Sequence, residues 1–82
     1  MLQIILAQNR QRAIGGLAQL ANNIVILENS NVMSNKNDII NYKDEIKQYN
    51  KLLLNEDIKM EDIDNILTFI SITDEIIINK FT

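Results

Sequence analysis

The carboxylates in the last third of the chain are the first residues that could do chemistry. Glu61, Asp62 and Asp64 lie close together, as the ligands of a calcium loop do. An EF-hand loop, however, requires a glycine at its sixth position and a glutamate at its twelfth. Counted from Asp62, those positions hold Leu67 and Thr73, so such a loop is excluded. The three acids are instead typical of the first turn of a helix, where the helix dipole favours negative charge.

Asp74 and Glu75 form an adjacent pair of carboxylates. General acid–base catalysis requires groups that converge on one substrate in a pocket that tunes their pKa values. Neighbouring side chains on a helix point about 100° apart and do not converge. The chain also lacks histidine and cysteine, which removes the usual nucleophile–base pairs and the common ligands of zinc, haem and iron–sulfur clusters. We therefore expect no enzyme, no metal site and no cofactor.

Lys43, Lys47 and Lys51 recur at every fourth residue and so lie along one ridge of a helix. This ridge has three interpretations. It is a docking strip for an acidic partner or for phosphates, a solvated face partly balanced by Asp44 and Glu45, or an internal neighbour of the acidic third segment. The solvated face is the interpretation that we favour from the sequence.

Arg10 and Arg12 precede a Leu-Ala-Gln-Leu-Ala run that invites comparison with a DNA-binding helix-turn-helix. A recognition helix presents basic and polar side chains to base edges, but residues 22–27 contain no charge. The formal net charge is −3, so nucleic acids and anionic membranes repel the chain at long range. We expect neither of them as a partner.

Helices must position these side chains, because the chain has no proline and only two glycines. β-Sandwiches and small barrels need several tight turns, which draw on both residue types. The apolar spacing predicts three helical segments, at about residues 2–28, 38–54 and 60–80. Loops rich in Asn, Asp, Glu and Ser separate them, at residues 29–35 and 55–57.

The first segment has an apolar seam whose members follow one another in steps of four and three: Ala13, Leu17, Leu20, Ile24 and Leu27. Gly15 and Gly16 interrupt this segment. They either break it into two helices or form a smooth patch on one continuous helix, where another helix approaches closely. We favour the continuous helix.

The second segment has the most regular seam, in steps of three and four: Ile39, Tyr42, Ile46, Tyr49 and Leu53. It is an amphipathic helix with Asp38 in its first turn, and Ser34, Asn35 or Asn37 is expected to cap its N-terminus.

The third segment has two adjacent apolar faces. One contains Ile63, Leu67, Ile70 and Ile77 and is interrupted by Asp74, and the other contains Ile66, Phe69, Thr73 and Ile76. This surface is too wide for a helix with one partner. Two β-strands over residues 67–73 and 76–82 are the rival interpretation, but the Asp-Glu sequence between them is a poor hairpin turn, so we favour a helix.

The 82 residues therefore predict one small all-α domain, a helical hairpin or three-helix bundle with coiled-coil-like packing. Because a chain of this size buries only about 60–65% of its unfolded surface, we expect a second polypeptide, either another copy or a larger complex, to cover the surplus. The expected interface residues are Leu17, Leu20, Ile24, Tyr42, Tyr49, Ile66, Phe69 and Ile70. The two tyrosines suit the core as well as an interface, because a buried hydroxyl needs a polar partner.

The predicted function is a non-enzymatic protein–protein interaction or assembly component. The alternative is a small acidic regulator or inhibitor that blocks a functional surface of a partner. Abundant Ile, Asn and Lys indicate an AT-rich genome, such as that of a low-GC bacterium or one of its phages. The sequence shows no export signal and no apolar stretch of the roughly 20 residues needed to span a membrane, so we expect the host cytoplasm or a virion as its location.

Overall fold

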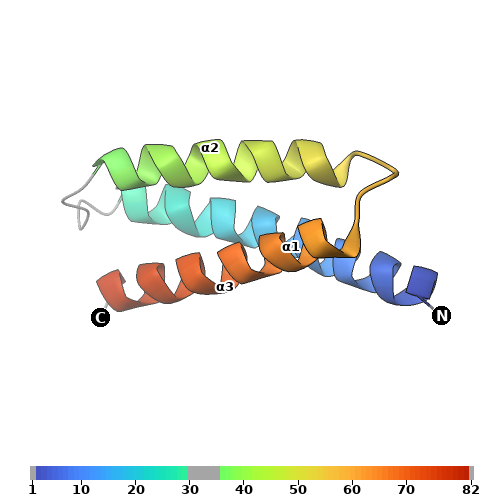
Figure 1. Ribbon diagram of the computed structural model, residues 1–82. Helices are drawn as coiled ribbons and strands as arrows, with labels where there is room; N and C mark the ends of the chain where they lie inside the picture. The colour runs from blue at the N-terminus through green and yellow to red at the C-terminus, as the bar shows by residue number, and fades with distance from the viewer. Residues whose placement is uncertain (1, 30–35, 82) are drawn as a thin grey trace.

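The computed structural model describes residues 2–29 and 36–81, which form three helices. They are α1 (Leu2–Asn29), α2 (Lys36–Leu53) and α3 (Met60–Phe81). As Figure 1 shows, α2 runs back along α1, and α3 then returns in the general direction of α1. The predicted all-α fold is confirmed in its three-helix form, and each boundary lies within two residues of its expected place. The hairpin of two strands predicted as a rival for the third segment is wrong, since these residues belong to α3.

Helix α1 continues through both glycines, as the favoured interpretation predicted. A Cβ atom placed on Gly16 would lie 2.9 Å from Cδ1 of Ile70 in α3, whereas one placed on Gly15 would meet nothing within 4 Å. Gly16 therefore marks the point where α1 and α3 approach closely. The helix-turn-helix comparison also fails, because the Leu-Ala-Gln-Leu-Ala run lies within this uninterrupted helix.

The core is built from one apolar stripe of each helix. The stripe of α1 has the predicted members, Ala13, Leu17, Leu20, Ile24 and Leu27. The stripe of α2 also follows the prediction, with Ile39, Ile46 and Leu53 buried and its two tyrosines partly buried against the core. These two helices thus meet at steps of three and four, which is the spacing of coiled-coil packing.

The stripe of α3 differs from the prediction. Its buried members are Ile63, Ile66, Ile70, Thr73 and Ile77, again in steps of three and four, so it draws on both expected faces. Asp74 lies beside this stripe and does not interrupt it, while Leu67 and Phe69 are half-buried at its edges. Both predicted faces and the observed stripe advance by 3.5 residues on average, so the spacing alone could not choose among them.

The α2–α3 connection is held by short-range and long-range hydrogen bonds. The Asn55 side-chain oxygen accepts a hydrogen bond of 3.0 Å from the backbone N–H of Asp57, and the buried Ile58 follows. The Arg10 guanidinium of α1 donates to the backbone carbonyl of Leu53, at the end of α2. The predicted loop at residues 55–57 is thereby confirmed and is tied to α1.

The other predicted loop, at residues 29–35, is described only at Asn29, which ends α1. The expected capping residues Ser34 and Asn35 lie outside the described residues. Asn37 does not cap α2, because the helix has already begun at Lys36. Asp38 lies in the first turn of α2, and Glu61 and Asp62 lie in the first turn of α3, as predicted, whereas Asp64 lies beyond that turn.

Candidate functional site

Five of the eight expected interface residues lie inside the bundle. Leu17, Leu20, Ile24 and Ile66 are at most 1% exposed, and Ile70 is 9% exposed. These side chains pack against one another within a single chain, so they offer no surface to a partner. Their assignment to an intermolecular interface is therefore corrected: three short helices suffice to cover the stripes when all of them share one core.

The other three expected interface residues lie at the edge of the core and are half-buried. The rings of Tyr49 and Phe69 lie 5.0 Å apart with 57° between their planes, and this contact joins α2 to α3. Burial raises the pKa of the Tyr42 phenol, and the carboxylates of Asp38 and Glu45 raise it further. All three aromatic residues therefore serve mainly in packing, with one edge towards the surface.

The apolar residues that remain exposed are different from those predicted. Isolated exposed apolar side chains are normal on any protein, so the informative ones are those that line a common depression. The large exposed apolar residues are Ile4, Ile5, Ile14, Val25, Ile26, Ile40, Leu52, Leu54, Ile72 and Ile78.

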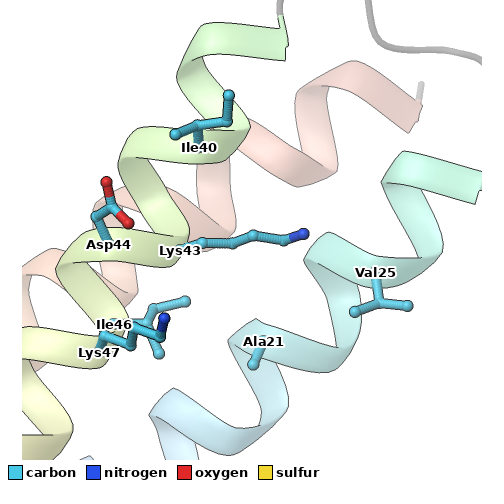
Figure 2. A pocket seen from close by; sticks show the side chains of 7 residues that line it. All are labelled: Ala21, Val25, Ile40, Lys43, Asp44, Ile46 and Lys47. Carbon is cyan, nitrogen blue, oxygen red and sulfur yellow. The ribbon is translucent and has the colours of Figure 1, made fainter.

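One depression of this kind is a groove between α1 and α2, with a volume of about 360 Å³, which we name the α1–α2 groove. Figure 2 shows the residues that line it, Ala21, Val25, Ile40, Lys43, Asp44, Ile46 and Lys47. Val25 on one bank is 48% exposed, and Ile40 on the other is 55% exposed. The small Ala21 side chain leaves room between them for an inserted side chain.

Charge in the α1–α2 groove is confined to the bank formed by α2. Residues 13–27 of α1 contain no charged side chain. Lys43 extends towards α1 and forms an ion pair of 2.7 Å with Glu28, whereas Asp44 points away from α1 (Figure 2). Lys47 has no acidic partner among the described residues. The groove is therefore apolar, with Lys47, unpaired within the described helices, at its α2 edge.

This arrangement decides part of the lysine-ridge question. The first lysine pairs with α1, and the first two line the groove beside α1. The internal interpretation, in which the ridge neutralises the acidic start of α3, is wrong for Lys43. Docking and solvation remain for Lys47 and Lys51, and both side chains are exposed.

A second depression, with a volume of about 390 Å³, lies between α2 and α3, and we name it the α2–α3 face. It is lined by Tyr49, Leu52, Asp62, Asn65, Thr68, Phe69 and Ile72. Asp38 and Glu45 lie two heptads and one heptad before Leu52 and so share its side of α2. None of these residues is basic, so this face is apolar with acidic edges.

Sequence reasoning missed the groove residues, although a signal for them was present. Ala21, Val25 and Ile40 each directly follow a seam residue, so they widen the apolar stripe on the side where α1 faces α2. Which side of a seam meets a neighbour, however, depends on the arrangement of all three helices. The hydrogen bond from Arg10 to Leu53 is not predictable from the sequence, because nothing local to either residue indicates it.

The described residues contain no group of three or more His, Cys, Asp or Glu side chains that could hold a metal ion. In the same part of the chain, no helix combines the length and the apolar character needed to cross a membrane. The Oδ1 atom of Asp74 is buried, and it has no hydrogen-bond partner within residues 2–29 and 36–81. No protein-family model, curated protein or solved structure matches the chain.

Proposed function

We propose that this protein is a non-enzymatic helical assembly component that binds another polypeptide in the α1–α2 groove. The observation that carries the proposal is the groove itself, where Val25 and Ile40 remain about half exposed on opposite banks after the core has formed. A groove between two helices, with apolar banks and a small residue at its floor, is the shape that receives an amphipathic helix.

The binding energy would come from a few apolar contacts in this groove. Interfaces derive most of their affinity from a small number of well-buried anchors, and the surrounding polar residues exclude water and set specificity. Val25 and Ile40 are the receiving positions for such an anchor. Lys47 at the edge favours partners that carry acids beside their apolar stripe.

Site-specific photocrosslinking tests the proposal. A photoreactive phenylalanine derivative replaces Val25, and the matched control carries it at Gln19, which is exposed and lies one turn after Gly16, on the side of α1 towards α3. In cells that make the protein, irradiation should give a discrete protein adduct at position 25 only, and excess unmodified protein should compete with it. Equal adducts at both positions, or none at position 25, would contradict the proposal.

A second candidate function is a small acidic regulator that covers a basic surface of its partner. The exposed carboxylates of Glu61, Asp64 and Glu75 on α3 favour it. Reversing the charge of Glu61 and Asp64 should abolish binding by such a regulator. The same change should leave the crosslink at position 25 intact if the groove is the binding site.

The genomic setting forms part of the proposal. The abundance of Ile, Asn and Lys, whose codons are AT-rich, favours a phage or another mobile element of a low-GC bacterium, and the protein would then act in the host cytoplasm or within a virion. Genes for capsid or tail proteins beside its own gene would support assembly, whereas a neighbouring nuclease or toxin gene would support the regulator.

A further inference from the structure

We propose that the occupant of the α1–α2 groove is the α2–α3 face of a second copy of this chain, so that copies associate head to tail. This inference rests on the proposed function and names its partner. Both surfaces expose large apolar side chains, Val25 and Ile40 in the groove and Leu52 and Ile72 on the face. Both apolar surfaces are exposed to water in the isolated chain, and contact between them would bury both.

Charge complementarity identifies the second copy as the partner. Of the charged residues in the groove, Lys43 is already paired with Glu28 of α1 and Asp44 points away from α1, which leaves Lys47 without an acidic partner among the described residues. The α2–α3 face carries Asp62, with Glu45 on the same side of α2 as Leu52. Contact between the groove of one copy and the face of another brings Lys47 to these carboxylates, which favours that pairing and steers the encounter.

The same charges disfavour a symmetric dimer. A two-fold axis through the groove would bring Lys47 of both copies together, and one through the face would bring Glu45 and Asp62 of both copies together. Like charges opposed across an interface are unfavourable. A heterologous contact avoids both repulsions, and each added copy leaves one groove and one face free.

The two surfaces are separate and can be occupied at the same time. Lys43 and Lys47 directly follow the seam residues of α2, whereas Glu45 and Leu52 directly precede seam residues. They therefore lie on opposite flanks of the helix. Head-to-tail contacts of this kind close into a ring or continue as a filament, which suits a component of an assembly.

Sedimentation velocity on the full chain tests the inference with variants that each disable one surface. The groove variant is Val25→Glu with Ile40→Glu, and the face variant is Leu52→Asn with Ile72→Asn; all four positions are exposed, and circular dichroism checks that both variants fold. The wild-type chain should form species larger than a dimer as its concentration rises, and each variant alone should be a monomer. An equimolar mixture should stop at a heterodimer, because one intact groove and one intact face remain.

Salt dependence supplies an independent readout. Association of the wild-type chain should weaken as ionic strength rises, because screening acts on the exposed lysine–carboxylate pairs. Lys47→Glu should weaken association and remove most of this dependence. A single variant that still forms dimers would overturn the head-to-tail geometry, as would a mixture of the two variants that forms no heterodimer.

The outcomes separate this inference from the proposed function. A wild-type chain that stays monomeric at every concentration overturns head-to-tail association. The photocrosslink at position 25 then tests the proposed function by itself. An adduct with a different polypeptide would support the proposed function, and the absence of any specific adduct would contradict it. An adduct of twice the chain mass supports both proposals.

Discussion

Replacing Gly16 with alanine tests the close approach of α1 and α3, and Gly15→Ala is a matched control on the same helix. Both changes add one methyl group and remove one helical glycine. Their surroundings differ, because a Cβ at position 15 meets nothing within 4 Å, while one at position 16 meets Ile70 Cδ1 at 2.9 Å and Cγ2 at 3.4 Å.

The expected free energies of unfolding follow from these distances. Alanine in place of a helical glycine stabilises a helix by about 1 kcal/mol, and Gly15→Ala should show this full gain. At position 16 the terminal methyl of Ile70, the flexible end of that side chain, must move, which costs about 0.5–1.5 kcal/mol for an unfavourable rotamer. Gly16→Ala should therefore be less stable than Gly15→Ala by about 0.5–1.5 kcal/mol.

Urea and thermal unfolding, followed by circular dichroism, measure this difference. For a domain of this size, about 1 kcal/mol corresponds to a change in Tm of about 4–8 °C. Gly15→Ala should raise the Tm by this amount, and Gly16→Ala should raise it less or lower it slightly. Dilute protein at high ionic strength keeps any self-association from contributing to the transition.

A double-mutant cycle locates the cause. Ile70→Val removes the Cδ1 atom and costs about 0.5–1.5 kcal/mol by itself. In that background, Gly16→Ala should recover most of the gain seen at position 15, so the two changes should couple favourably. Equal stabilisation by Gly15→Ala and Gly16→Ala in the wild-type background would show that α1 and α3 do not meet at this point.

Three further predictions concern the core, the α2–α3 connection and pH. Ile66→Ala should lower the free energy of unfolding in urea by about 2–5 kcal/mol, because that side chain is fully buried, while the exposed Ile72→Ala should change it by no more than about 0.5 kcal/mol. Arg10→Met should cost about 1–3 kcal/mol in thermal unfolding, because the Leu53 carbonyl loses a charged donor, and full stability in this variant would refute the bond. Burial raises the pKa of Tyr42 in the folded state above its ordinary value of 10.0. The stability that the protonated phenol contributes is therefore present below pH 10.0 and is lost as the pH rises through the folded-state pKa. Unfolding measured across this pH range should show the loss in the wild-type chain but not in Tyr42→Phe.

The sequence predicted most of the fold because its apolar residues keep one spacing. The predicted seams of α1 and α2 agree with the buried stripes of these helices, and the α2 seam is the clearer one because charged residues flank Ile46 on both sides. In α3 the apolar residues surround the helix, and the periodicity alone could not choose among overlapping stripes. The burial of Thr73, with Asp74 beside the core, is decided by the two other helices.

The candidate site was less predictable, and for a related reason. The sequence indicated a surplus of apolar residues, but the strongest seam residues, such as Leu20, were assigned to the interface when they form the core. The groove is lined by secondary positions such as Val25, whose role depends on how α2 lies against α1. The sequence shows that lysines and carboxylates lie on opposite flanks of α2. Which of these flanks lies beside α1 and which lies beside α3 is known only from the arrangement of the three helices.

The hydrogen bond from Arg10 to Leu53 has a consequence for how the bundle selects one alignment. Seams of repeated Ile and Leu can slide past one another by a heptad and still bury similar apolar area. Arg10 lies on the seam of α1, four residues after Leu6 and three before Ala13. Its guanidinium reaches the Leu53 carbonyl in the last turn of α2 only when the two helices are in this axial register. Together with the small Gly16 opposite Ile70, this bond fixes the longitudinal register of three otherwise interchangeable stripes.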